Sequence, residues 1–169
     1  MSPRGAACAL CVVGLLAYAP VAAPQAAKPD AGRYFIPRGA ARQVVTVERP
    51  SAAKPAPGAR VVIVTQALAI KESGPKETVE RFGEVYAFSP SFVAVRREQP
   101  TLFVFMNLQP DDVHDFALLG EKGQVLTDLE LPPLKKTQYV LTFHRAGVFE
   151  FACLRHMPAM AGQVLVREP

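Results

Sequence analysis

The sequence predicts a small all-β domain, an antiparallel β-sandwich, that follows an export signal and an extended arm. The chain has 169 residues, which is enough for one domain with a substantial core, and 50% of the residues are hydrophobic. Sixteen prolines and eleven glycines argue against a helical bundle. From residue 60 onward, short stretches rich in β-branched and aromatic residues follow one another, and glycine and proline turn signals separate them.

The first 23 residues have the features of a secretory signal peptide. Arg4 supplies a positive charge, residues 6–16 form a short apolar run, and small residues cluster between residues 17 and 23. We therefore expect a periplasmic or otherwise exported protein. The apolar run is short for a membrane span, and an uncleaved anchor is the alternative. The cleavage position stays open because proline follows both candidate sites, Ala19 and Ala23.

Residues 24–57 are rich in Ala, Pro, Lys and Arg, which predicts a flexible, extended basic arm. Residues 28–82 carry 10 Lys or Arg against 5 Asp or Glu, whereas residues 83–169 carry 8 against 10. The formal net charge of +4 therefore arises before residue 83. Nucleic-acid binding is not expected, because the basic residues are spaced singly and no aromatic residues are interleaved to stack on bases. We expect a solvated tether with weak affinity for an anionic membrane or an acidic partner.

Residues 58–83 are expected to add an extra strand at 60–68 and a short helix at 76–82, with Gly74 and Pro75 at the entry of the helix. Residues 84–169 are expected to form the main domain, in which alternating and continuous apolar patterns predict a series of short strands. These are 84–88, 92–96, 101–108, 113–119, 124–129, 137–144, 147–153 and 162–167.

The residues with metal-binding chemistry are concentrated near the C-terminus. Cys153 is the only cysteine after the leader, and His156 and Met160 follow it closely. A thiolate, an imidazole and a thioether form a soft donor set, and two His, one Cys and a weak axial Met are the set that selects copper and supports electron transfer. This loop lacks one imidazole. We expect His114, which lies at the start of a predicted strand, to supply it, because that strand end and this loop can meet at one pole of a sandwich.

These residues carry a resemblance to the cupredoxins, the type 1 copper domains of plastocyanin, pseudoazurin and amicyanin, and to periplasmic copper-tolerance cupredoxins. The resemblance covers about residues 84–168. It includes Y-A-F-S-P-S-F-V-A-V at 86–95, the stretch 107–116, and the pattern G-x-F-x-F-x-C-x-x-H followed by M-x-G-x-V-x-V at 147–166. It implies a Greek-key β-sandwich that holds one type 1 copper. The implied ligands are His114, Cys153 and His156 in the equatorial plane and Met160 on the axis.

Two features depart from the pattern of those proteins. The spacing C-x-x-H-x-x-x-M falls between amicyanin-like and plastocyanin-like loops, and Met157 is a second thioether nearby. Met160 is the expected ligand because the M-x-G-x-V-x-V continuation starts there. An Asn commonly follows the first His in those proteins, whereas this chain has Asp115. A carboxylate can accept the same backbone hydrogens, but it adds negative charge beside the metal, which predicts an atypical potential and a blue or a green site.

Other candidate residues are assigned simpler roles. His144 follows a strand pattern and precedes a glycine turn, so we expect a turn or surface residue. Met106 is expected to pack in the core. The aspartates at 111, 112 and 115 lack the alternating spacing of a calcium loop. The sequence contains no phosphate-binding loop, Ser-His-Asp order or H-E-x-x-H motif.

The resemblance implies single-electron transfer between redox partners outside the cytoplasm, such as a cytochrome or an oxidase. One alternative is a periplasmic copper-tolerance protein that binds or oxidises Cu(I), in which Met157 or His144 would be a relay ligand. Another is a redox subunit of a respiratory oxidase complex, held by the arm. Whether the chain is an enzyme stays open. An electron carrier is not an enzyme, whereas a protein that oxidises Cu(I) is a cuprous oxidase. His156 and residues 157–159 are expected to form an apolar docking rim.

Overall fold

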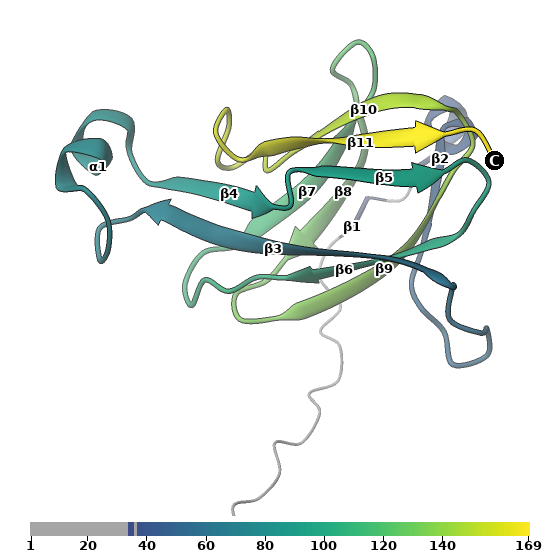
Figure 1. Cartoon of the computed structure of the whole chain (residues 1–169), viewed down its shortest axis with the longest axis horizontal. Coiled ribbons are helices and arrows are strands. Elements are labelled where there is room, and N and C mark those ends of the chain that lie inside the picture. Colours follow the sequence, from purple (N-terminus) through teal and green to yellow (C-terminus); the bar gives the residue numbers. More distant parts are fainter. Residues whose placement is uncertain (1–33, 36) are drawn as a thin grey trace, which may run out of the picture.

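The computed structural model describes residues 34–35 and 37–169. The predicted signal peptide, residues 1–23, lies outside the described residues, as does the beginning of the predicted arm. Two β-sheets pack face to face (Figure 1). Within the described ranges, no helix is both long enough and apolar enough to cross a membrane.

One sheet has six strands in the order β1-β8-β7-β10-β11-β5, and the other has five in the order β2-β9-β6-β3-β4. The elements along the chain are β1 Tyr34–Phe35, the 3-10 helix η1 Gly39–Gln43, β2 Val45–Glu48, β3 Ala59–Ala69, α1 Lys76–Phe82, β4 Val85–Ser89, β5 Phe92–Arg96, β6 Thr101–Met106, β7 His114–Leu119, β8 Val125–Leu131, β9 Lys136–Phe143, β10 Gly147–Ala152 and β11 Ala161–Arg167.

The expected all-β sandwich is confirmed, but its strands are not all antiparallel. Strand β3 runs parallel to β6, and β5 runs parallel to β11, so both sheets are mixed. Helix α1 and strand β5 have the bounds that the sequence predicts. The residue pattern of a strand shows which face is buried, whereas its direction depends on which other strand becomes its neighbour. The sequence pattern therefore did not indicate these two parallel pairs.

Part of the segment that we expected to be a flexible arm belongs to the sandwich. Strand β2 pairs antiparallel with β9 at one edge of the five-stranded sheet. Val45 and Val47 are buried and the residues between and after them are not, so the short sequence V-T-V-E alternates as a half-buried strand should. The prolines on either side of this stretch concealed that alternation. Strand β3, which corresponds to the extra strand predicted at 60–68, lies inside the same sheet, between β6 and β4.

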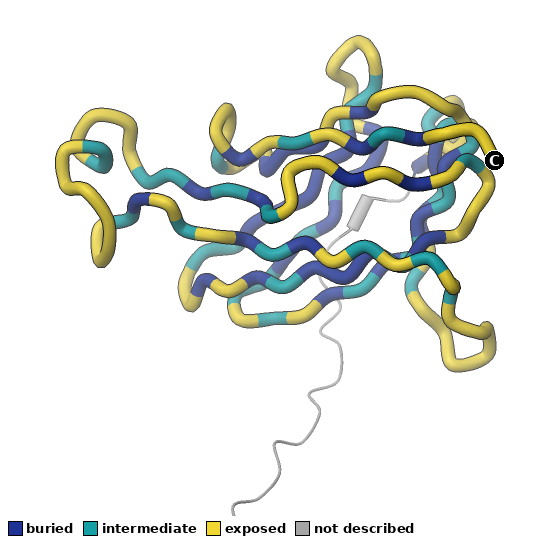
Figure 2. The backbone as a smooth tube through the Cα atoms, viewed as in Figure 1, coloured by how far each residue is buried: buried dark blue, intermediate teal, exposed yellow. Residues whose placement is uncertain are grey.

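The core between the sheets combines aromatic and aliphatic side chains, and the buried positions alternate along most strands (Figure 2). Phe116 contacts Phe105 and Phe151, with ring centroids 4.9 and 4.7 Å apart. Phe88 contacts Phe151 from the other sheet at 5.4 Å. Burial of each ring contributes about 1.5–3 kcal/mol to the free energy of unfolding. Phe116 and Phe151 lie two residues from His114 and Cys153 along the chain, so the aromatic core extends close to the predicted metal ligands.

Gly162 permits a close approach between β11 and the start of β5. A Cβ at this position would collide with the carbonyl oxygen of Ser91 and with the ring of Phe151. The next residue, Gln163, donates its N–H to the same Ser91 oxygen at 2.8 Å. Glycine therefore allows the loop that follows β10 to turn directly back into the sheet.

Candidate metal site

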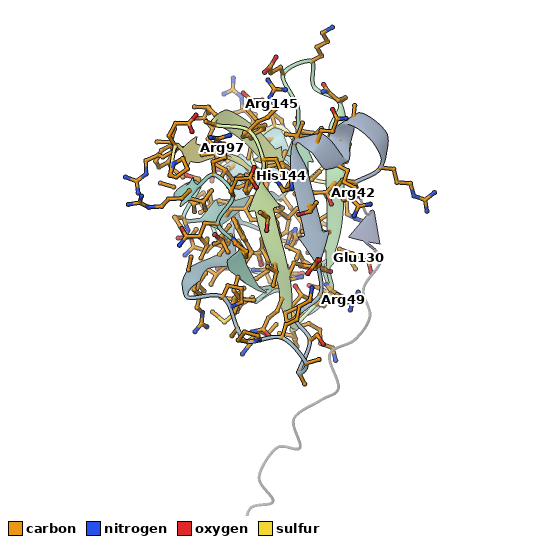
Figure 3. All side chains as sticks on the ribbon, turned by 90° about the vertical axis from the view of Figure 1, so that its right-hand side faces the viewer. Arg42, Arg49, Arg97, Glu130, His144 and Arg145 are labelled. Atoms are coloured by element: carbon orange, nitrogen blue, oxygen red, sulfur yellow. The ribbon has the colours of Figure 1, made fainter. Side chains whose placement is uncertain are left out.

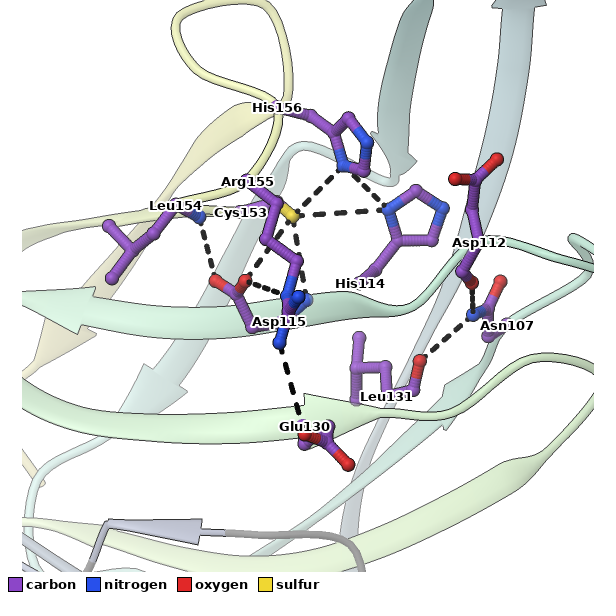
Figure 4. A network of polar contacts seen from close by, with 10 residues as sticks. All are labelled: Asn107, Asp112, His114, Asp115, Glu130, Leu131, Cys153, Leu154, Arg155 and His156. Atoms are coloured by element: carbon purple, nitrogen blue, oxygen red, sulfur yellow. Dashed lines mark hydrogen bonds and ion pairs between the residues drawn. The ribbon is translucent and has the colours of Figure 1, made fainter.

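Three of the four predicted ligands come together at one end of the sandwich. His114 is the first residue of β7, whereas Cys153 and His156 lie on the loop between β10 and β11 (Figure 4). Strands β7 and β10 are direct antiparallel neighbours, with Ala117 opposite Ala152. The start of β7 and the loop that follows β10 therefore meet at the same edge of the sheet.

The three donor atoms are close enough to share one metal ion. The Nδ1 atoms of His114 and His156 are 3.1 Å apart, and the Sγ atom of Cys153 lies 3.9 Å from the first and 3.3 Å from the second. Three ligands placed in a plane at metal–ligand lengths of about 2.0–2.3 Å would be separated by about 3.6 Å. The observed separations bracket this value. Two nitrogens and one sulfur therefore form a cluster able to hold a metal ion.

Burial controls the protonation of this cluster in the metal-free protein. His114 and Cys153 have no exposed surface, whereas His156 is half-buried. Burial, together with the charge of His156, lowers the pKa of His114 to about 4. Burial also raises the pKa of the Cys153 thiol to about 11. At neutral pH the metal-free site therefore holds a neutral His114 and a protonated thiol, and a metal ion must displace the thiol proton to bind.

We expect the metal-free protein to lose stability as the pH falls from about 6.5 to 4, because an unfolded histidine has a pKa of about 6.5. Acid therefore protonates the unfolded chain before it protonates the folded His114. Full titration of this one group would lower the free energy of unfolding by about 3 kcal/mol. Urea unfolding at pH 7 and at pH 4 measures the change. The His114→Gln variant is the control and should lose about this part of the pH dependence. An equal pH dependence in both proteins would contradict the assignment.

The two candidate thioethers, those of Met160 and Met157, differ in burial. Met160 is completely buried, whereas Met157 is 53% exposed. The N–H of Cys153 donates to the Met160 carbonyl at 2.9 Å, and the N–H of Met160 donates to the His156 carbonyl at 3.1 Å. These two backbone hydrogen bonds close the loop and hold the backbone of Met160 next to Cys153 and His156. The arrangement favours Met160 over Met157 as a fourth ligand.

Neither a family model nor a curated protein matches the sequence, but solved structures match the fold. Auracyanin B has a TM-score of 0.51 at 11% identity, over 74% of this chain and 99% of that one. The copper nitrite reductase from Nitrosomonas europaea has a TM-score of 0.52 at 11% identity, over 69% and 51%. A multicopper oxidase has a TM-score of 0.50 at 15% identity, over 68% and 46%. The chain has a cupredoxin-like fold. It spans about half the length of the last two proteins.

In this cupredoxin-like fold, Asp115 connects the two ligand segments, as the sequence predicts. Its Oδ1 atom accepts a hydrogen bond from the backbone N–H of Leu154 at 2.7 Å. The backbone N–H of Asp115 points to the Cys153 Sγ atom at 3.4 Å. An N–H directed at the sulfur stabilises the thiolate form that binds metal.

Arg155 is a site residue that the sequence analysis missed. Its Nε atom lies 3.4 Å from Asp115 Oδ2, and its Nη2 atom lies 3.9 Å from Glu130 Oε2 (Figure 4). These residues are far apart in the sequence and share no recognisable pattern. Their proximity follows from the loop closure and from the pairing of β7 with β8.

Tyr86, at the start of β4, is a second residue whose role the sequence did not indicate. Its ring centroid lies 4.9 Å from that of His114 and 4.6 Å from that of His156, so the phenol ring contacts both imidazoles. The Tyr86 hydroxyl donates a hydrogen bond to the Asp112 carboxylate. Burial and this carboxylate raise the pKa of Tyr86, which keeps the phenol protonated. The sequence feature that could have drawn attention to Tyr86 is its place in the Y-x-F-x-P pattern of residues 86–90.

Asn107 holds the loop that leads to His114. Its Nδ2 group donates to the backbone carbonyls of Asp112 and Leu131 at 2.8 and 2.9 Å. Its Oδ1 atom accepts from the Thr65 hydroxyl at 2.8 Å and from the Gln109 N–H at 3.0 Å. The buried amide thus makes four hydrogen bonds, which fix the loop that leads to His114.

His144 is not brought to the cluster. It follows β9, and its Nδ1 atom lies 2.8 Å from Glu98 Oε2. Strand β9 begins beside the site, where Lys136 pairs with Met106, and it ends at Phe143. The eight residues of β9 span roughly 25 Å, so His144 lies at the opposite end of this strand from Lys136. Figure 3, which faces the right-hand side of Figure 1, labels His144 and the next residue, Arg145.

Met106, which the sequence analysis expects to pack in the core, is half-buried on β6.

Proposed function

We propose that this chain is a mononuclear copper protein that transfers single electrons outside the cytoplasm. The observation that carries the proposal is the cluster of two imidazole nitrogens and one cysteine sulfur at one end of a cupredoxin-like sandwich. This soft donor set suits copper and not hard cations such as Mg²⁺ or Ca²⁺. Two of the similar structures are described as a copper nitrite reductase and a multicopper oxidase, which supports the choice of copper.

The proposed ligands have distinct roles. Cys153 would supply the thiolate, His114 and His156 the imidazole nitrogens, and Met160 a weak fourth donor. Bound copper would supply a one-electron couple between Cu(I) and Cu(II). The chain's own part is to hold these side chains still in both states. The burial of His114, Cys153 and Met160 in a packed sandwich supports this role.

The route for electrons is proposed to run through His156, because it is the half-buried member of the cluster. Leu154 and Met157 flank it on the same loop and are 45% and 53% exposed. This apolar rim suits the small interfaces, below about 1,200 Å², through which redox proteins meet briefly. The expected partner is a redox protein such as a cytochrome or an oxidase.

A role in copper tolerance is a second candidate, and one observation favours it. Met157 presents a thioether to solvent three residues before the buried Met160, where it could receive Cu(I) before the ion moves inward. The position of His144 at the opposite end of β9 does not favour it as the relay ligand. Membership of an oxidase complex, held by the arm, stays a prediction.

The decisive experiment is the optical and EPR spectrum of the purified protein with Cu(II), followed by redox titration. A single thiolate-to-copper band with one copper per chain, fully reversible on reduction, is expected. A colourless complex would contradict the proposal. Electron exchange with a cytochrome and oxidation of added Cu(I) are then compared in wild type and Met157→Leu. If the protein is an electron carrier, Met157→Leu should exchange electrons with the cytochrome at the wild-type rate. If it is a Cu(I) receptor, Met157→Leu should take up and oxidise added Cu(I) more slowly than wild type.

Replacing Met160 with glutamine is expected to lower the reduction potential and alter the colour without loss of copper. A thioether favours Cu(I), and an amide oxygen is a harder donor that favours Cu(II). Redox titration measures the change, and Met157→Leu is the control, which should leave both potential and spectrum nearly unchanged. Equal effects at the two methionines would remove Met160 as the axial ligand.

A further inference from the structure

We propose that Arg155 is a positioning residue for the metal ligands, because its ion pairs with Asp115 and Glu130 compensate negative charge beside the thiolate and hold the ligand loop against the sheet. The inference rests on the proposed copper site. Nothing in the donor set itself requires an arginine between Cys153 and His156.

The geometry makes Arg155 a bridge between one loop and two strands. Asp115 on β7 and Glu130 on β8 are directly opposite in the strand register. The guanidinium of Arg155 reaches both carboxylates, at 3.4 and 3.9 Å (Figure 4). The loop between Cys153 and His156 is therefore anchored to neighbouring strands of the six-stranded sheet.

Two consecutive loop residues occupy the two oxygens of one carboxylate. The Leu154 N–H donates to Asp115 Oδ1 at 2.7 Å, and the Arg155 Nε atom lies 3.4 Å from Asp115 Oδ2. The Asp115 side chain is only 7% exposed, so its two oxygens depend on these partners instead of on water. Loss of the guanidinium would leave the negative charge on Asp115 Oδ2 without its ion-pair partner. It would also release the loop at Arg155 from the sheet.

The charge balance beside the sulfur supports the same role. Asp115 Oδ2 lies 3.6 Å from the Cys153 Sγ atom, which carries a negative charge when it binds metal. A carboxylate so close to a buried thiolate is unfavourable unless a cation offsets it. Among the groups that face Asp115, the guanidinium of Arg155 supplies that positive charge. Its removal would add net negative charge near a bound copper ion, which would stabilise Cu(II) relative to Cu(I).

The test uses the full-length protein and compares Arg155→Gln, Arg155→Lys and Asp115→Asn with the double variant Asp115→Asn/Arg155→Gln. Arg145→Gln is the matched control. Arg145 is 54% exposed, against 55% for Arg155, and it pairs with Glu121 at 2.7 Å, but it follows the far end of β9. Two quantities are measured: the midpoint potential of the copper form, and the hydrogen-exchange rate of the Leu154 amide in the metal-free form.

We expect Arg155→Gln to lower the potential and to accelerate exchange of the Leu154 amide, and Arg145→Gln to change neither. Arg155→Lys should retain most of the potential, because it keeps the charge, but should lose part of the exchange protection, because an ammonium does not form the planar two-partner bridge. In the Asp115→Asn background the Arg155→Gln change should have a smaller effect on both quantities, since the partner is already altered.

Two results would overturn the inference. One is an Arg155→Gln protein that matches Arg145→Gln in both measurements. The other is an equal effect of Arg155→Gln in both backgrounds, which would make Arg155 an isolated surface charge. Failure of the copper proposal is distinguishable from either, because it would show as a wild-type protein without a thiolate-to-copper band. The exchange measurement needs no metal and still decides whether Arg155 positions the loop.

Discussion

Replacing Cys153 with serine is expected to abolish the intense visible absorption of the copper-loaded protein while the sandwich stays folded. The absorption arises from charge transfer between thiolate sulfur and copper, and a serine hydroxyl has no equivalent transition. Cys153 is completely buried, so the exchange of sulfur for oxygen should lower the free energy of unfolding by about 0.5–3 kcal/mol, which is the range of most single substitutions. The fold should survive that loss.

Absorption spectroscopy and thermal unfolding of Cys153→Ser and wild type measure the two effects together. Met157→Leu is a suitable control, because it alters another sulfur of the same loop at an exposed position. Retention of an intense band in the serine variant would exclude Cys153 as a ligand and with it the proposed site.

The second large effect is expected from His156→Gly, which should lose the visible spectrum and recover it when imidazole is added. His156 is half-buried, so a free imidazole can enter the space that the side chain leaves. His114→Gly should also lose the spectrum but recover it poorly, because His114 is completely buried and contacts the ring of Tyr86.

His144→Gly provides the matched control for both variants. It removes an imidazole at the opposite end of β9 and should leave the spectrum unchanged. Titration of each variant with Cu(II), and then with imidazole, distinguishes these cases. Loss of the spectrum in His144→Gly with retention in His114→Gly would mean that the assignment of the nitrogen ligands is wrong.

The sequence predicted the strands of the sandwich well because each carries its own burial pattern. Residues 92–96 alternate strictly, and β5 has the same bounds. The same local information could not show that β5 lies parallel to β11, since that depends on the path of the chain around the core. It also did not reveal β2, whose four residues alternate between two proline-rich stretches.

In the candidate site, too, local sequence patterns indicated some residues and not others. The spacing of Cys153, His156 and Met160 within one loop is a local signal, and one loop with a missing imidazole was enough to indicate His114. Arg155 and Tyr86 could not be assigned roles in this way. Their partners lie on other strands, and only the packed structure shows which charges and rings become neighbours.

The enclosure of the cluster has a consequence for how the protein is loaded. Cys153, His114 and Met160 have no exposed surface, and the Tyr86 ring contacts both imidazoles. We therefore expect an ion from solution to reach the sulfur when the segment 153–160 moves away from the sheet. The rate of metallation should therefore reach a plateau as the copper concentration rises, at the opening frequency of that segment. Retention of the ion is governed by the same opening, so a chelator in large excess should remove copper at a rate that does not depend on its concentration.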